Sequence, residues 1–445
     1  MNAVNKENIG LKLALLFSGI LYFVFAYVIK RDDTILLFST IGLLFVFYFY
    51  VLRKSVISER LFLFLIVSAF GFRFIFMMST PALSDDFYRF IWDGRLINSG
   101  INPFAYLPDY IHNNALLNGT ENNELFNKMN SPHYFSVYPP VLQGVFFISA
   151  KLSFNNNFVA VILLRLFILI SEVGTCYFLM KIISHFKLPK PNVLVYILNP
   201  LVIIELSGNL HFEAIMLFFI TASVYFLIIN KLIYSALFFA LAVSTKMIPL
   251  ILLPLFVKSI GFKKGFVYSV IVFVITVILF LPFIDKQLVA NIANSVGLYF
   301  QKFEFNASFY YLIRWLGFQV SGYNEIALIG KILPIVSFIF ILIISFKNSV
   351  KEIDHGFFYK ILQILFIYYL CALIVHPWYV SFLILISVFS NARFAIIWSL
   401  LIFGSYITYA TLPYYENTLL LWIEYAVVLA WFFLEKKKLK LVDLT

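Results

Sequence analysis

One short stretch of acids and bases stands out in a very apolar chain. The segment SDDFYRFIWDGR places the carboxylates Asp85, Asp86 and Asp93 close in sequence to the cations Arg89 and Arg95. If the segment is helical, Asp86, Arg89 and Asp93 share one face, because they stand at positions i, i+3 and i+7. A carboxylate beside cations can accept a proton from a hydroxyl group while the cations neutralise a phosphate. A solvated amphipathic helix between two membrane spans would explain the same pattern without chemistry.

Further polar residues stand within or beside apolar runs, where charged groups are costly and usually face a cavity or a partner. Lys246 lies in an apolar run that Pro249 interrupts. A broken helix at membrane depth is tolerated where it lines a wet cavity, so Lys246 is a candidate to bind a phosphate. An interfacial aromatic belt would explain Trp378 and Tyr379 alone, but not the His-Pro before them. The remaining candidates are Asn209, His211, Glu213, Arg314 and His376.

The composition indicates a polytopic membrane protein. The chain has 445 residues, of which 62% are hydrophobic and 12% charged, whereas a soluble domain carries roughly 25% charged residues. Its net charge of +11 lies mostly in short loops between apolar runs, where Lys and Arg are topology signals, so we exclude nucleic acid as a partner. The two cysteines, Cys176 and Cys371, both lie in apolar runs and allow no disulfide framework.

Apolar runs of the length needed to cross a bilayer define the expected architecture. We predict one all-α domain over residues 1–445 with about 12–14 transmembrane helices and short juxtamembrane helices in an outer loop. The segments 138–152 and 232–257 are too short or too broken to be counted as spans with the others. The expected spans are 9–29, 34–52, 61–78, 158–180, 192–208, 212–229, 265–284, 326–346, 357–375, 378–390, 393–411 and 417–434.

The basic clusters set the expected orientation, because Lys and Arg favour the cytoplasmic side. All of them can be cytoplasmic only if 138–152 and 232–257 do not cross the membrane. The loops 79–137 and 285–325, the residues 209–213 and the turn at His376-Pro377 then face outside. The polar candidates other than Lys246 gather on that side, and Lys246 could approach from within the membrane. We therefore expect a multi-pass protein of the cytoplasmic (inner) membrane with an extracytoplasmic site. The clusters are Arg53, Lys54 and Arg60, then Lys181, Lys187 and Lys190, then Lys258, Lys263 and Lys264, then Lys347 and Lys351, and the C-terminal EKKKLK.

The chain resembles the polytopic glycosyltransferases of the GT-C fold. The likeness is strongest to the bacterial polyprenyl-phosphate-mannose-dependent mannosyltransferases. The motifs that carry it occur in the expected order over about 300 residues. They are SDDFYRF with WDGR, GINP, Tyr138-Pro139-Pro140, Asn199-Pro200-Leu201 followed by Asn209-Leu210-His211, the Lys246 to Pro249 segment, and His376-Pro377-Trp378-Tyr379.

The resemblance implies a lipid-phosphate sugar as donor and a catalytic Asp in the first large outer loop. By likeness that Asp is Asp86, with Asp85 as the alternate. Relatives often have His-x-Asp where this chain has His211-Phe212-Glu213, so Glu213 would act from a longer arm. The expected donor-phosphate ligands are Arg89, Arg95, Lys246 and Arg314. The expected substrate-binding residues are Asp93, Tyr138, Asn209, His211, Glu213, His376, Trp378 and Tyr379.

The predicted reaction is transfer of a hexose, with mannose favoured, to a hydroxyl of a lipid-linked or cell-envelope glycan, with inversion at the anomeric carbon. Asp85 and Asp86 could hold a divalent ion, but cations that neutralise the phosphate would make it dispensable, so we expect no metal or other cofactor. The partners are then the polyprenyl-phosphate donor, the glycan acceptor and membrane lipids.

Two other classes remain open from the sequence. A flippase or transporter of a lipid-linked sugar would use the same cations without chemistry, but transporters commonly show internal repeats and none is visible here. A polymerase or ligase of surface polysaccharide would be expected to have its large polar loop later in the chain. The chain has no P-loop, GxGxxG, HExxH or GxSxG motif, so an activated substrate must carry its own leaving group.

Overall fold

The computed structural model describes residues 3–53, 58–301, 303–347, 353–390, 392–411 and 413–442. Of the predicted basic clusters, Lys54 and Lys351 lie outside these residues. Throughout the described parts of the chain the regular elements are helices, and no β-strand is formed among them. This confirms the prediction of an all-α fold. The chain forms two compact units, each of which combines stretches that are distant in sequence. That residues 1–445 act as one domain stays a prediction.

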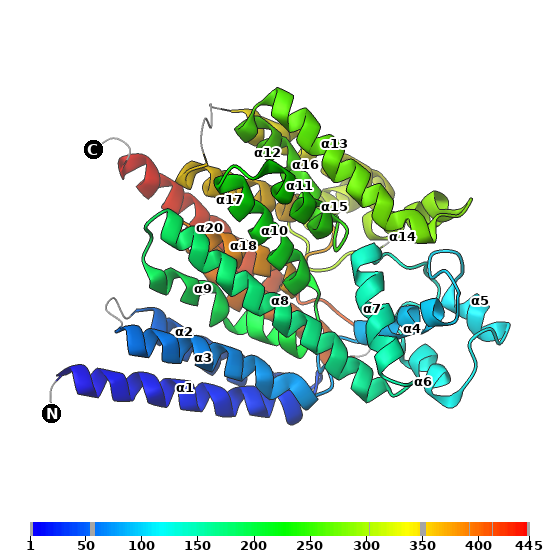
Figure 1. The fold of residues 1–445 in the computed structure, drawn as a ribbon, viewed down its shortest axis with the longest axis horizontal. Coiled ribbons are helices and arrows are strands. Elements are labelled where there is room, and N and C mark those ends of the chain that lie inside the picture. Colours follow the sequence, from blue (N-terminus) through cyan, green and yellow to red (C-terminus); the bar gives the residue numbers. More distant parts are fainter. Residues whose placement is uncertain are drawn as a thin grey trace. The chain divides into compact units, whose positions relative to one another are not determined.

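The first unit comprises Met1–Leu83, Leu179–His211 and His376–Thr445. Its three N-terminal helices α1, α2 and α3 lie side by side (Figure 1). The C-terminal helix α20 packs against α19. The helices of this unit are α1 (Ala3–Tyr27), α2 (Thr34–Leu52), α3 (Glu59–Ile75), η1 (Phe76–Met78), η2 (Lys190–Val193), α9 (Leu194–Ile197), η3 (Val202–Gly208), η6 (Pro377–Tyr379), α18 (Val380–Ser387), α19 (Phe394–Leu401), η7 (Ile402–Ala410) and α20 (Thr418–Val442).

The second unit comprises Ser84–Phe178 and Phe212–Val375. The helix α8 (Asn157–His185) belongs to it as far as Phe178. The other helices of this unit are α4 (Asp86–Asn98), α5 (Pro108–Asn113), α6 (Thr120–Lys128), α7 (Pro140–Leu152), α10 (Glu213–Ile228), α11 (Leu232–Val243), η4 (Ile248–Leu252), α12 (Leu253–Ile260), α13 (Phe262–Phe280), η5 (Leu281–Phe283), α14 (Leu288–Gln301), α15 (Phe309–Ser321), α16 (Ile326–Phe346) and α17 (His355–Cys371).

Seven helices of the described residues are long and apolar enough to cross a membrane. A bent pair, Lys190–Ile197 with Val202–Gly208, would make eight, with a bend of 56° between its halves. The protein is therefore polytopic, as predicted, but these helices are fewer than the 12–14 expected. Segments such as 212–229 and 357–375 form helices of 10–17 residues instead. The apolar run at 378–390 forms the short helix α18 after the 3₁₀ turn η6, and the run at 393–411 forms the short helix α19, which the 3₁₀ turn η7 continues.

The two segments that were expected not to cross the membrane are short or broken. Residues 138–152 form α7, which has 13 residues and begins at Pro140. Residues 232–257 break between α11 and η4, where Lys246 has no helical structure. The break at this position is confirmed. The side of the membrane on which each loop lies stays a prediction.

Helix α4 is held against α7 by a very close backbone approach. An alanine Cβ built at Gly94 would lie 2.2 Å from the carbonyl oxygen of Phe146, so only glycine fits between the two helices. The ring of Phe90 stacks on that of Phe146, with 4.9 Å between the ring centroids and 14° between the planes. This contact fixes the helix that carries the acidic stretch.

Candidate active site

The acidic pair lies at the beginning of α4. The helix starts at Asp86, and Asp85 is the residue before its first turn. The predicted helical face is therefore formed. Both side chains are half-buried, and Asp86 Oδ1 accepts a hydrogen bond from Asn130 Nδ2 at 3.0 Å. A carboxylate in the first turn is stabilised by the positive end of the helix dipole. This position suits a base that must meet a substrate.

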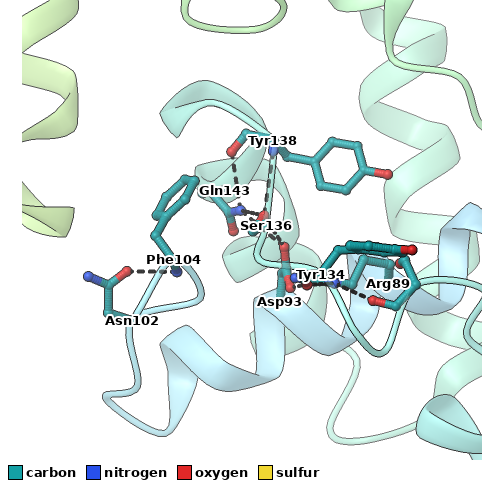
Figure 2. Close-up of polar contacts among 9 residues, drawn as sticks. Arg89, Asp93, Asn102, Phe104, Tyr134, Ser136, Tyr138 and Gln143 are labelled. Carbon is teal, nitrogen blue, oxygen red and sulfur yellow. Dashed lines mark hydrogen bonds and ion pairs between the residues drawn. The ribbon is translucent and has the colours of Figure 1, made fainter. Parts of the chain in front are cut away.

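Asp93 lies on the same helix but in the protein interior. Its side chain is fully buried, and three donors surround its carboxylate, as Figure 2 shows. Arg89 Nε donates to Oδ1 at 2.7 Å, and Ser136 Oγ and Gln143 Nε2 both donate to Oδ2. Buried charges that are paired in this way hold elements together. The structure thus places Asp93, a predicted substrate ligand, in a network that joins α4 to α7.

Arg89 connects α4 to the loop that follows α6. Its Nη1 donates to the carbonyl oxygen of Ser131 at 3.0 Å. It also donates to the carbonyl oxygen of Tyr134 at 2.9 Å (Figure 2). Arg89 is only 2% exposed. Its Nη2 is buried and has no hydrogen-bond partner among the described residues. The guanidinium of this predicted phosphate ligand therefore orders the segment 131–134.

Arg95 is used in the interior in a similar way. Its guanidinium donates to the Asn122 side chain on α6, to the Asn155 carbonyl oxygen at 2.6 Å and to Asn157 Oδ1 at 2.6 Å. Burial lowers the pKa of Arg95, and the nearby Glu121 and Glu124 oppose that shift. These contacts tie α4 to α6 and to the first residues of α8.

Lys246 lies beside a carboxylate that the sequence did not pair with it. Its Nζ donates to Oε1 of Glu213, the first residue of α10. The Lys246 side chain is 22% exposed, whereas that of Glu213 is 1% exposed. Glu213 Oε2 is buried without a hydrogen-bond partner among the described residues. An ammonium group that is positioned by a buried carboxylate and is still partly exposed can bind an anion with little reorganisation.

The other two predicted residues of this unit lie in different surroundings. Arg314 forms an ion pair with Glu304 and lies over the ring of Tyr311, 4.3 Å from the centroid. The Tyr138 backbone N donates to Ser136 Oγ at 3.4 Å, and the ring extends away from the Asp93 network (Figure 2). That ring packs edge-on against Phe90 at 5.0 Å. Tyr138 therefore supports the helix that carries Asp86.

The remaining predicted residues belong to the first unit. The imidazole of His211 stacks on the Trp378 ring with centroids 3.5 Å apart. The His376 ring stacks on the same indole at 4.3 Å and meets Tyr379 edge-on at 5.5 Å. Asn209 Oδ1 accepts a hydrogen bond from the Leu83 backbone N at 3.1 Å. The imidazoles of His211 and His376 and the indole of Trp378 thus form a stack of three rings.

Glu205 is a buried carboxylate that the sequence reasoning missed. It lies in the π-helical turn η3, a type of irregularity that is common at functional sites. The Tyr406 hydroxyl donates to its two oxygens at 2.9 and 3.0 Å, and Asn209 Nδ2 donates at 3.2 Å. His211 Nε2 lies 3.5 Å from Oε2. The available signal was a lone carboxylate in the middle of the apolar run LVIIELSG.

A metal centre was not expected from the sequence. Within the described ranges of the chain, no three His, Cys, Asp or Glu side chains are grouped so that they could hold a metal ion. The expectation that the reaction needs no metal or other cofactor stays a prediction.

Comparisons with known proteins agree with the resemblance seen in the motifs. A protein of Mycobacterium tuberculosis (strain ATCC 25618 / H37Rv), alpha-(1->6)-mannopyranosyltransferase A, is 25% identical over 268 residues, which are 59% of this chain and 50% of that relative. The match therefore spans half the length of the relative. No solved structure is significantly similar to this chain. The family model of the alpha-(1->6)-mannopyranosyltransferase N-terminal domain matches residues 9–260, a range that contains the acidic stretch, Glu213 and Lys246. The chain belongs to this family.

Proposed function

We propose that this protein transfers a mannosyl residue from a polyprenyl-phosphate donor to a hydroxyl group of a lipid-linked or cell-envelope glycan. The reaction takes place at the outer face of the cytoplasmic membrane and inverts the anomeric carbon. Membership of the mannopyranosyltransferase family supports the sugar and the reaction class. The polytopic helical fold suits a donor with a long hydrocarbon chain.

The observation that carries the proposal is the contrast between two carboxylates of one helix. Asp93 is fully buried, and its carboxylate already accepts hydrogen bonds from three donors of the protein. Asp86 is half-buried at the beginning of α4 and accepts a hydrogen bond from a neutral amide. A general base must lie within hydrogen-bond reach of the hydroxyl from which it accepts the proton. The partly exposed position of Asp86 supports it as the proposed base, with Asp85 as the alternate.

In the proposed reaction the acceptor oxygen forms a bond to the anomeric carbon while the bond from that carbon to the phosphate oxygen breaks. Asp86 accepts the hydroxyl proton. The polyprenyl phosphate leaves with the electron pair of the broken bond, and Lys246 neutralises the charge that it gains. A single displacement at the anomeric carbon gives inversion. No covalent intermediate with the protein is required.

The other predicted residues take supporting roles in this proposal. Arg89 and Arg95 use their guanidinium groups within the second unit, so they fix α4 and its neighbouring segments. Arg314 remains a proposed phosphate ligand from the second outer loop. Asn209, His211, His376, Trp378 and Tyr379 remain proposed substrate-binding residues, with Glu205 as the partner of His211.

Reconstitution into proteoliposomes tests the proposal. The purified protein is incubated with radiolabelled polyprenyl-phosphate mannose and a cell-envelope extract, and the label is followed into product. We expect labelled glycan with wild-type protein and none with Asp86→Asn. Movement of the donor across the bilayer without labelled glycan would favour a flippase and contradict the proposal.

A further inference from the structure

The outer loop 79–137 carries an exposed aromatic pair that has no role in the proposed reaction. Tyr106 and Tyr110 stack in a parallel offset arrangement, with centroids 5.4 Å apart and 12° between the planes. They are 44% and 50% exposed. Single exposed apolar side chains are common on proteins, whereas two stacked rings form a flat apolar surface on which a ligand can pack. Two such rings in one stack indicate a surface for a ligand.

The helix α5 that carries Tyr110 is firmly anchored on its other side. Ile111 is fully buried, and the His112 ring stacks on Phe126 of α6 at 4.0 Å with 7° between the planes. Phe126 in turn contacts Trp92 of α4 at 6.0 Å. The position of Tyr110 is therefore fixed by packing of α5 through α6 onto α4, and Tyr106 stacks on it. A preformed surface of this kind loses little conformational entropy when it binds a ligand.

A polar pair accompanies the aromatic rings. Asp109, next to Tyr110, meets the His133 imidazole through its Oδ2. The side chains of His133 and Asp109 are 73% and 27% exposed. The Asp109 backbone N also donates to the Pro132 carbonyl oxygen at 3.2 Å. The surface thus offers flat rings together with hydrogen-bonding groups.

This surface is linked to the proposed base by one short segment. Asn130 donates to Asp86 Oδ1 at 3.0 Å, and Arg89 donates to the Ser131 and Tyr134 carbonyl oxygens. His133 lies between these contacts in the same segment and reaches Asp109. A chain of contacts within the second unit therefore connects Asp86 to the helix that carries Tyr110.

We propose that Tyr106, Tyr110, Asp109 and His133 form a binding site for a distal sugar residue of an oligosaccharide acceptor. The C–H face of a pyranose packs on aromatic rings, and its hydroxyl groups bond to a carboxylate and an imidazole. Contact with membrane lipid would cover the rings but would not explain a polar pair, Asp109 and His133, beside them. The assignment rests on the proposed glycosyl transfer. It specifies an acceptor of several sugars.

The test compares the double variant Tyr106→Ala/Tyr110→Ala with wild-type protein. Donor-free binding of a mannose oligosaccharide to purified protein is measured by calorimetry, and turnover is measured with a single-sugar and an oligosaccharide acceptor. We expect affinity for the oligosaccharide to fall about tenfold, because two stacking contacts are lost. KM should rise only for the long acceptor, with kcat unchanged.

Two controls keep the result specific. Tyr106→Phe/Tyr110→Phe retains both rings and should bind the oligosaccharide nearly as wild type does. Tyr323→Ala removes a tyrosine that is 73% exposed elsewhere and should change nothing. Equal effects on short and long acceptors, or normal oligosaccharide binding with weaker binding to liposomes, would overturn the site. Absence of transfer by wild-type protein would contradict the proposed function alone, because donor-free binding is read separately.

Discussion

Asp86 and Asp93 stand on one face of α4, yet their surroundings differ completely. In the protein interior, the Asp93 carboxylate accepts hydrogen bonds from Arg89, Ser136 and Gln143. Asp86 has an exposed asparagine as its neighbour at the beginning of the helix. Asp93 therefore joins structural elements, whereas we propose that Asp86 is catalytic.

Asp86→Asn should lower turnover by roughly 10² to 10⁴, the usual value of a general base, because the amide cannot accept the proton. Donor binding should survive, since the phosphate gains nothing from a nearby anion. Initial rates with labelled donor, and donor binding measured separately, check both statements. Asp85→Asn should be milder. If instead Asp85→Asn is inactive and Asp86→Asn turns over normally, the two roles are exchanged.

Lys246→Met should weaken donor binding by roughly ten- to a hundredfold, because one charge-assisted contact to the phosphate is lost. Acceptor binding should change little. Binding of the polyprenyl-phosphate sugar to purified protein measures the effect. The exposed Lys231→Met is the matched control and should bind the donor normally.

Removal of Lys246 alone leaves the buried Glu213 carboxylate without its cation, which can destabilise a protein by about 3–5 kcal/mol. The double variant Lys246→Met/Glu213→Gln separates this effect from binding, because it removes both charges. Normal donor affinity in that double variant would make the pair purely structural.

At the scale of elements, the contact between α4 and α7 is the one most sensitive to added volume. Gly94→Ala would place a methyl group 2.2 Å from the Phe146 carbonyl oxygen and 2.9 Å from the Ala150 Cβ. We expect a loss of about 1–3 kcal/mol in the free energy of unfolding, together with lower turnover, because α4 shifts. Thermal unfolding in detergent measures the first effect.

Gly144→Ala is the matched control for this contact. Gly144 lies on α7 and has no atom within 4 Å of an added Cβ. This variant should be neutral or stabilised by up to about 1 kcal/mol, because alanine favours a helix. Similar destabilisation by both variants would show that α7 tolerates no substitution, and that the approach of α4 is not the cause.

Local patterns were enough to predict some elements but not their partners. The helix α4 is formed where the shared face of Asp86, Arg89 and Asp93 required one, and Pro249 predicted the break near Lys246. The burial of Asp93 could not be seen, because Ser136 and Gln143 are 43 and 50 residues away in sequence. The pairing of Lys246 with a residue 33 positions earlier was hidden for the same reason.

Several of the predicted spans form helices shorter than a full span for a physical reason as well. Hydropathy measures only how apolar a run is, and 3₁₀ turns or breaks within an apolar run shorten its helices without changing its composition. Residues 393–411 illustrate this, because α19 has only 8 residues before η7 begins.

At the scale of the whole molecule, the orientation in the membrane is the prediction that matters most. A single cysteine at Asn118, which is exposed in the loop 79–137, should react with an impermeant maleimide in spheroplasts. The background lacks Cys176 and Cys371, both of which are buried. A cysteine at Lys263 should react only after lysis. Reaction at Asn118 only after lysis would place the loop in the cytoplasm.

The ion pair between Glu213 and Lys246 also bears on how the chain is made. The helices α10 and α11 pack against each other as an antiparallel hairpin, which brings the start of one close to the end of the other. During synthesis Glu213 leaves the ribosome well before Lys246. Glu213 stands at the beginning of α10, where an unpaired charge costs less than the roughly 2.5–3.5 kcal/mol at the centre of a membrane helix but still disfavours insertion. We therefore expect α10 to integrate poorly in a chain truncated after Ile228, and normally once Lys246 is included or Glu213 is replaced by Gln. Glycosylation mapping of such truncated chains in microsomes would reveal a translocation step that waits for the second helix.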